Sequence, residues 1–185
     1  ISAAKLCAQV ILTTHDWASR REEAVDRILS VFPAGLIAVR SSADGEDGER
    51  ESLAGVYESV TDVSAEKSAI EAAVDRVVTS YGTRAERQEI LVQEMVSDVA
   101  MSGVILSRDL DTGSPYYVIN YDDFSGRTDT VTGGGHSKLV QVQRNRPQAL
   151  RSERMRKLVD VMQEIERVTG STALDVEFCA QSDMT

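Results

Sequence analysis

Short runs of β-forming residues, separated by polar turns, are the feature that most constrains the fold of this chain. They outnumber the helical patterns, and the segment 107–115 between two of them contains Asp111, Thr112 and Gly113, which favour a tight turn. We therefore predict hairpins and mostly antiparallel sheets. The expected strands lie within residues 5–12, 36–40, 89–96, 101–108, 116–121, 128–132, 138–143 and 173–180.

Amphipathic helices are expected between some of these strands. Apolar residues recur at helical spacing over residues 17–32, 70–81 and 158–168. Together with the strands, these helices predict the α+β class. The first helix should be bounded by Asp16 and Pro33, the second by Ser64 and Gly82, and the third by Pro147 and Gly170.

Charge and composition exclude several classes of protein. The chain has 185 residues and a formal net charge of −10, which argues against a nucleic-acid surface, because phosphate backbones require clustered Lys and Arg. No apolar run approaches the about 20 residues needed to span a bilayer. Cys7 and Cys179 are too few for a disulfide framework or a zinc site. We expect a cytoplasmic protein without membrane or nucleic-acid partners.

An arginine stands where an apolar run meets a long polar stretch. Residues 35–57 read GLIAVRSSADGEDGERESLAGVY, with Arg40, Ser41 and Ser42 directly after the apolar run. A guanidinium group beside hydroxyls and a small-residue turn could bind a phosphate anion. Alternatively, Arg40 forms an ion pair with one of the acidic residues that follow. Residue type alone favours the ion pair.

A pair of carboxylates follows near the C-terminus, in the run ALDVEFCA. Side chains alternate along a strand, so Leu174, Val176 and Phe178 should face a core. Asp175 and Glu177 should then share the other face, about 7 Å apart. Two carboxylates at this spacing could bind Mg²⁺, which prefers oxygen ligands and shares them with phosphates. They could equally form the solvated face of an ordinary amphipathic strand.

Other segments are less specific. The run ILVQEMV could offer backbone hydrogen bonds beside an apolar slot that suits a purine ring, or it could be a core strand. The glycine turn at 133–135 is a weak phosphate-loop signal without a following helix. Neither His15 nor His136 has a partner at the spacing of a nucleophilic triad.

Taken in order, these segments resemble the N-terminal nucleotide-binding domain of phosphoenolpyruvate synthase and pyruvate phosphate dikinase, which has an ATP-grasp fold. The family pattern V-R-S-S-A-x-x-E-D-x-x-x-x-S-F-A-G is similar to residues 39–55, with Leu53 at the Phe position. The patterns V-Q-x-M-V and S-G-V-x-F-T-R-D-P-x-T-G are similar to VQEMV and SGVILSRDLDTG, with Leu110 at the Pro position. The strand LDVEF is similar to the family's D-I-E strand, and the resemblance covers residues 35–180.

The resemblance implies specific roles. Arg40, with Ser41, would clamp the phosphates of ATP, and the loop through Ser52, Ala54 and Gly55 would fold over them. Residues 93–96 would form the hinge between two lobes and meet the adenine; they are Gln93, Glu94, Met95 and Val96. Asp175 and Glu177 would bind Mg²⁺ at the triphosphate.

The resemblance also implies an organisation and a reaction. Residues 1–185 would form one ATP-grasp-type domain of two lobes, with the nucleotide cleft between them, as part of a longer protein. ATP would phosphorylate a histidine on a separate domain, and a further domain would bind the acceptor substrate. The 185 residues alone are then expected to bind ATP without turning it over. Two alternatives remain open: a nucleotide-binding module without catalysis, and an interaction domain that keeps the fold.

Overall fold

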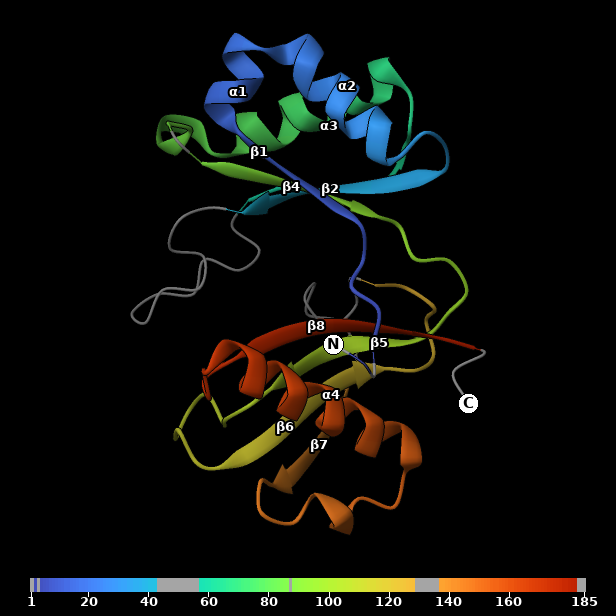
Figure 1. Ribbon diagram of the computed structural model, residues 1–185, viewed down its shortest axis with the longest axis vertical. Coiled ribbons are helices and arrows are strands. Elements are labelled where there is room, and N and C mark those ends of the chain that lie inside the picture. The colour runs from blue at the N-terminus through green and yellow to red at the C-terminus, as the bar shows by residue number, and fades with distance from the viewer. Residues whose placement is uncertain (1, 3, 43–56, 87, 129–136, 183–185) are drawn as a thin grey trace. The chain divides into compact units, whose positions relative to one another are not determined.

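The computed structural model describes residues 2, 4–42, 57–86, 88–128 and 137–182. The chain divides into two compact units (Figure 1). The N-terminal unit is Cys7–Met95, and the C-terminal unit combines Val96–Thr185 with Ile1–Leu6. Each unit contains a four-stranded antiparallel sheet, so the predicted α+β class with mostly antiparallel sheets is confirmed. No helix in the described segments is long and apolar enough to cross a membrane.

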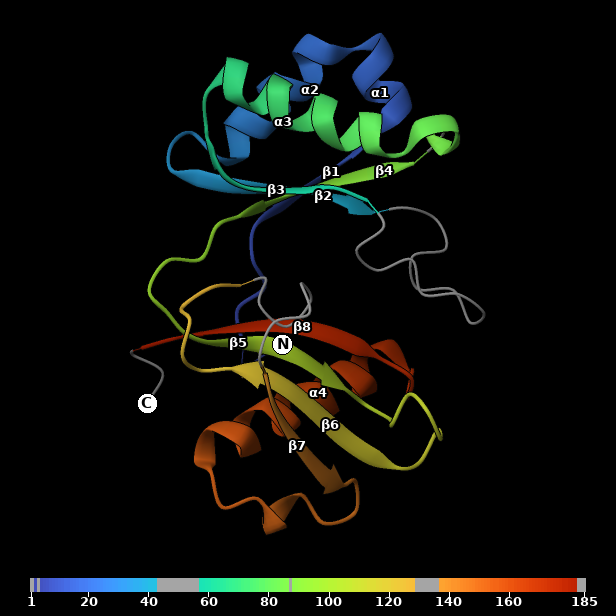
Figure 2. The same cartoon turned by 180° about the vertical axis from the view of Figure 1, so that it is seen from behind.

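The N-terminal unit carries its helices on one face of its sheet, as Figures 1 and 2 show from opposite sides. The strand order is β1-β4-β2-β3. The strands are β1 (Gln9–Thr13), β2 (Leu36–Ser42), β3 (Ser59–Ser64) and β4 (Glu89–Glu94). The helices are α1 (Thr14–Ser19), α2 (Arg21–Val31), α3 (Lys67–Ser80) and the short η1 (Gly82–Arg84).

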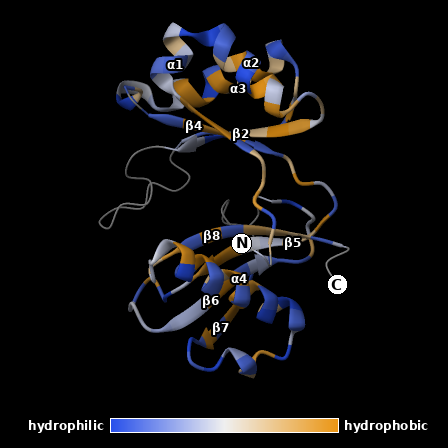
Figure 3. Ribbon diagram, viewed as in Figure 1, coloured by the Kyte–Doolittle hydropathy of each residue, from blue (hydrophilic) through white to orange (hydrophobic). Residues whose placement is uncertain are grey.

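The core of this unit lies between the helices and the sheet. Val25 and Ile28 of α2 and Val74 of α3 are fully buried, and they pack in one cluster with Ile37 and Val39 of β2. Figure 3 shows hydrophobic stretches along α3 and β2. Because side chains alternate along a strand, the residues between these core positions point to the opposite, helix-free face of the sheet.

The C-terminal unit has the strand order β7-β6-β5-β8, with one long helix packed on one face. Met155, Leu158 and Met162 of that helix pack against Ile119 and other apolar strand residues. The strands are β5 (Val99–Leu106), β6 (Tyr116–Asp122), β7 (Lys138–Gln143) and β8 (Asp175–Gln181). The helices are α4 (Glu153–Thr169) and the short η2 (Pro147–Ala149).

The predicted helices exist, but their N-terminal boundaries were wrong. The single helix expected over residues 17–32 is two helices, α1 and α2, separated at Arg20, whose φ of −141° is not helical. Thr13, not Asp16, caps α1, because its hydroxyl accepts the backbone N–H of Asp16 at 3.0 Å. Likewise Glu66 rather than Ser64 precedes α3, and Ser152 caps α4, since Pro147 belongs to η2.

The C-terminal ends of two helices were predicted correctly. Gly170 adopts a left-handed φ of +73° directly after α4, and Gly82 a φ of +56° just after α3. Residues with a side chain rarely adopt the left-handed backbone region, so glycine at these positions ends a helix without strain.

One strand was missed, and one prediction cannot be placed. Strand β3 was not expected, because its sequence SVTDVS has few apolar residues and the strand lies at the sheet edge. The strand expected at 128–132 falls almost entirely outside the described residues.

Candidate functional site

Arg40 lies in β2 on the helix-free face of the N-terminal sheet. Its cross-strand neighbours are Leu91 of β4 and Ser59 of β3. The side chain is half-buried, and its Nε atom is buried. The sequence predicted that the strand would end at Arg40, but β2 continues to Ser42 because Ser41 and Ser42 pair with β4. The guanidinium group therefore belongs to the sheet surface and not to the strand end.

Ser41 points the other way. Alternation places its side chain on the side of the helices, so Ser41 and Arg40 do not share a face. The backbone N–H of Ser42 donates to the hydroxyl of Tyr81 at 3.1 Å, and the same hydroxyl donates to the carbonyl of Glu89. Tyr81 also stacks edge-on with Tyr57, with 5.0 Å between the ring centroids.

Tyr81 thus holds both ends of the segment that joins β2 to β3. The apolar periodicity predicted Tyr81 only as the last residue of the apolar stripe of α3. The signal that could have indicated more is its hydroxyl group, because a buried tyrosine O–H requires a partner. Ser52, Ala54 and Gly55, expected to fold over phosphates, lie outside the described residues, so their role stays a prediction.

The predicted hinge contains a boundary between the two units. Strand β4 ends at Glu94, and the chain passes from the N-terminal to the C-terminal unit between Met95 and Val96. Two backbone hydrogen bonds hold the start of residues 93–96 to the N-terminal unit. The N–H of Glu94 donates to the carbonyl of Ala8 at 3.2 Å, and the N–H of Met95 donates to the carbonyl of Leu36 at 3.0 Å. The start of this segment is therefore fixed to the sheet of the N-terminal unit.

Gln93 and Arg40 share the helix-free face of the N-terminal sheet. Gln93 pairs with Ala38, the residue two positions before Arg40 on the same face of β2. Beside them lie Leu91, half-buried, and Ile11, which is 41% exposed. This face therefore places a cation and an amide next to a partly exposed apolar surface.

Asp175 and Glu177 lie on the helix-free face of the C-terminal sheet, as the alternation predicted. Both residues are exposed, whereas Val176 and Phe178 between and after them pack against the core under α4. Within the described segments, no group of three or more His, Cys, Asp or Glu residues could hold a metal ion. The two carboxylates thus form an incomplete ligand set by themselves.

Asn120 shares this face and was missed by the sequence analysis. Val104 of β5 pairs with Glu177 on one side and with Asn120 of β6 on the other, so all three side chains point the same way. Asn120 is half-buried. The available signal was an amide in the otherwise apolar and aromatic run YYVINY.

The motif SRDLDTG builds the turn between β5 and β6. The Asp109 carboxylate accepts the backbone N–H of Thr112 at 2.9 Å and its hydroxyl at 2.6 Å. These hydrogen bonds, that of the hydroxyl first, lower the pKa of Asp109. Gly113 follows with a φ of +66°, and Leu110 is 77% exposed at the tip. The hairpin prediction is confirmed, and the motif has a structural role here.

Of the two histidines, only His15 lies within the described residues. His15 is exposed in α1 of the N-terminal unit, on the opposite side of that sheet from Arg40. His136 and the glycines at 133–135 lie outside the described residues.

Comparison with known proteins decides the family. The model of the pyruvate phosphate dikinase AMP/ATP-binding domain matches residues 4–122, which is more than half of the chain. The chain belongs to this family. Membership supports adenine-nucleotide binding, and two antiparallel sheets with flanking helices are consistent with an ATP-grasp-like fold.

The match covers part of the candidate site. It contains Arg40, the predicted hinge at 93–96 and strands β5 and β6, whereas Asp175 and Glu177 in β8 lie beyond it. A search of curated proteins found no significant match.

Proposed function

We propose that this chain is the ATP-binding domain of a dikinase-type phosphotransferase like phosphoenolpyruvate synthase or pyruvate phosphate dikinase. The phosphoryl group of ATP would go to a histidine on a separate domain, and from there to an acceptor. The observation that carries the proposal is the family match over residues 4–122, which includes the Arg40 and hinge segments.

In the N-terminal unit we assign the phosphates to Arg40 and the adenine to residues 93–96. A guanidinium group forms charge-assisted hydrogen bonds with phosphate oxygens, which are stronger than neutral ones. The apolar side chains of Leu91 and Ile11 beside Gln93 suit a purine ring. Ser52, Ala54 and Gly55 would supply backbone N–H groups from the loop, whereas Ser41 would support the start of that loop.

In the C-terminal unit we assign Mg²⁺ to Asp175 and Glu177. Two carboxylates are a donor set that Mg²⁺ accepts when phosphate oxygens and water complete its shell, so these residues fit the ion. Bound there, Mg²⁺ would neutralise charge on the triphosphate. In phosphoryl transfer the protein mainly positions the groups and neutralises charge, and Arg40 would do both for the phosphates.

Calorimetric titration with Mg-ATP tests the proposal. The unmodified protein should bind, and Arg40→Ala should weaken binding by roughly 1.5–3 kcal/mol, the size of a hydrogen bond to a charged group. The matched control is Arg27→Ala, an exposed arginine of α2, which should leave affinity unchanged. Failure of the unmodified protein to bind Mg-ATP would leave only the alternative of an interaction module.

The assignment of the carrier histidine to another domain is tested by mass spectrometry after incubation with ATP, under conditions that preserve phosphohistidine. Neither His15 nor His136 should be modified, because the carrier histidine is assigned to another domain. Phosphorylation of either residue would contradict this part of the proposal, even if Mg-ATP binds.

A further inference from the structure

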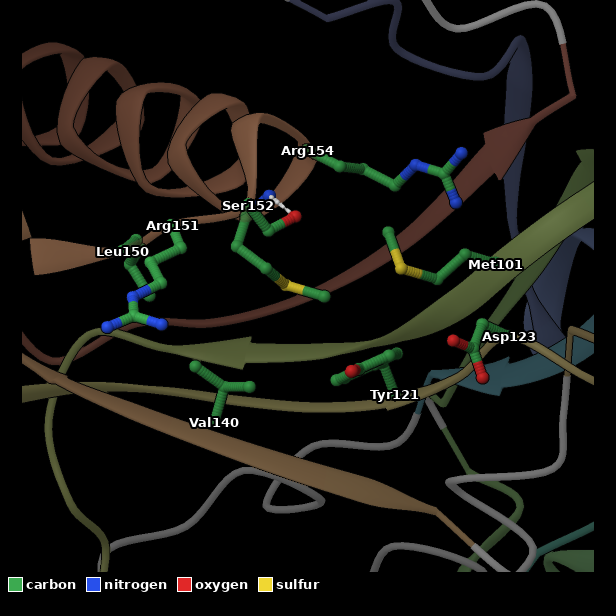
Figure 4. A pocket seen from close by; sticks show the side chains of 9 residues that line it. Met101, Tyr121, Asp123, Val140, Leu150, Arg151, Ser152 and Arg154 are labelled. Carbon is green, nitrogen blue, oxygen red and sulfur yellow. Dashed lines mark hydrogen bonds between the residues drawn. The ribbon is translucent and has the colours of Figure 1, made fainter.

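A cavity of about 330 Å³ opens in the C-terminal unit where α4 begins (Figure 4). It lies on the side of the sheet that α4 covers, and so on the face opposite to Asp175 and Glu177. It belongs to neither of the faces assigned to the nucleotide. Its lining residues are Met101, Tyr121, Asp123, Val140, Leu150, Arg151, Ser152, Arg154 and Met155.

The inner wall of the cavity is apolar. Met101 of β5 and Met155 of α4 are 1% and 6% exposed and belong to the core of the unit. Val140 and Leu150 pack against the same core. Methionine side chains adapt to the shape of a guest because they have several rotatable bonds. The wall therefore suits the apolar body of a small molecule.

The rim of the cavity carries two cations. Figure 4 shows Arg154 extending over Met101 on one side of Ser152, and Arg151 beside Leu150 on the other. Within the described part of the chain, neither guanidinium group makes a hydrogen bond or an ion pair. This contrasts with the neighbouring Arg156, whose guanidinium donates to the carbonyl of Leu150 at 2.7 Å.

Other charges at the rim leave it positive. Asp123 is the carboxylate in the lining, and Lys138 holds both of its oxygens, at 2.7 and 2.9 Å. This hydrogen-bonded pair raises the pKa of Lys138, so the lysine stays charged and compensates Asp123. In a chain with a net charge of −10, two arginines without a carboxylate partner at one cavity are a local exception.

The start of α4 also favours an anion at this rim. Ser152 caps the 17-residue helix, and its hydroxyl accepts the N–H of Met155 at 3.4 Å. The N–H groups of a first helical turn have no partner inside the helix and favour an anion. Arginine side chains can turn towards a phosphate or carboxylate and bind it with two parallel N–H groups.

We propose that this cavity binds a small organic anion, with a phosphate or carboxylate group at Arg154 and Arg151 and an apolar body against Met101 and Met155. A volume of about 330 Å³ is at the small end of ligand pockets, which limits the guest to about one ring or a short chain. The site is independent of the nucleotide.

Methionine-methyl NMR tests the proposal, because the chain has five methionines and two of them line the cavity. Phenyl phosphate should shift the Met101 and Met155 methyl signals saturably, while Met162, buried further along α4 and absent from the lining, shifts less. Benzoate is the carboxylate arm, and the tighter probe of the two identifies the anionic group. Inorganic phosphate and benzyl alcohol, each with half of the required chemistry, should bind more weakly than either.

Variants separate the site from non-specific binding. Arg154→Gln should weaken the tighter probe by about 10- to 100-fold, and Arg151→Gln by less, since Arg151 is exposed whereas Arg154 is half-buried. Arg167→Gln at the other end of α4 is the matched control and should have no effect. Unchanged free spectra of the variants would show that α4 still folds.

Three results would overturn the proposal. One is the absence of methyl shifts with both phenyl phosphate and benzoate. Another is an equal affinity of Arg154→Gln and the unmodified protein. The third is displacement of the bound probe by saturating Mg-ATP in competition, which would assign the probe to the nucleotide site. A protein that fails to bind Mg-ATP but binds phenyl phosphate would refute the proposed function and support this one.

Discussion

Tyr117 donates its phenolic O–H to the carboxylate of Glu166 over 2.9 Å and thereby joins β6 to α4. Arg144 completes the cluster, because its Nη2 donates to the same carboxylate at 3.0 Å. Its Nη1 donates to the carbonyl of Ser107 at 2.8 Å. Its guanidinium group stacks on the Tyr117 ring, 4.6 Å from the ring centroid. The side chains of Glu166 and Arg144 are only 9% and 21% exposed. One shielded carboxylate therefore accepts hydrogen bonds from both Tyr117 and Arg144.

Glu166→Ala should destabilise the protein. The substitution leaves Arg144 and Tyr117 without their acceptor in a shielded place, and we expect a loss of about 2–4 kcal/mol in the free energy of unfolding. Lys157→Ala is the control, because Lys157 forms an exposed pair with Glu153 at 3.8 Å and should cost less than about 0.5 kcal/mol. Urea unfolding measures the free energy of unfolding of both variants. Equal midpoints for the two variants would contradict a stabilising role of the cluster.

The same cluster predicts a pH dependence at the alkaline end. Burial away from water, and then the hydrogen bond to Glu166, raise the pKa of Tyr117. A group with a raised pKa in the folded state contributes stability that is fully present below its unfolded pKa of about 10 and is lost as the pH rises through the folded pKa.

Tyr117→Phe isolates this contribution. At pH 8 the variant should be less stable than the unmodified protein by about 1 kcal/mol, the worth of one hydrogen bond. Above a pH of about 10 the difference in stability should shrink. There the phenol ionises in the unfolded state but not yet in the folded state, which lowers the stability of the unmodified protein, and the variant has no phenol to ionise. Urea unfolding at both pH values checks this. A difference that stays constant up to pH 11 would show that Tyr117 is not linked to alkaline unfolding.

Gly103→Ala should disrupt the C-terminal unit. A Cβ atom at Gly103 would lie 2.1 Å from the carbonyl oxygen of Asn120 and 2.7 Å from the Cα of Tyr121, both in the backbone of β6. Backbone atoms of a paired strand cannot move aside cheaply, so we expect a loss of about 3 kcal/mol or more. Gly113→Ala is the control: its Cβ meets nothing within 4 Å, and its left-handed φ should cost about 1–2 kcal/mol. Thermal melts that rank the two variants the other way would be inconsistent with this packing.

Asp175→Asn and Glu177→Gln separate function from fold. Both side chains are exposed, so stability without ligand should change by less than about 0.5 kcal/mol or rise slightly. If the pair binds Mg²⁺, the affinity for Mg-ATP should fall about tenfold or more, because the ion loses a carboxylate ligand. Asp160→Asn, an exposed carboxylate of α4, is the control for charge alone. Thermal melts with and without Mg-ATP, together with titrations, measure these effects. If Mg-ATP stabilises the two variants as much as it stabilises the unmodified protein, the metal assignment is refuted.

The sequence by itself determined the features that depend on local periodicity. Alternation along β8 placed Asp175 and Glu177 opposite Val176 and Phe178 correctly, because successive side chains of any strand point to opposite faces. Gly170 was correctly expected at the end of α4, since a left-handed residue there requires no partner elsewhere in the chain. The ordered set of motifs, which runs from the Arg40 segment to the β8 strand, led to the family that the match over residues 4–122 shows.

Only the tertiary structure decided which residues meet. Arg40 and Gln93 share a face because β2 pairs with β4 across more than fifty residues, and Asn120 joins the face of Glu177 because β5 lies between β6 and β8. The break at Arg20 was missed for the same reason, and the edge strand β3 was missed because its sequence has few apolar residues. Strand pairing and helix boundaries are settled by which apolar surfaces are buried together, and this is a property of the whole unit rather than of any local pattern.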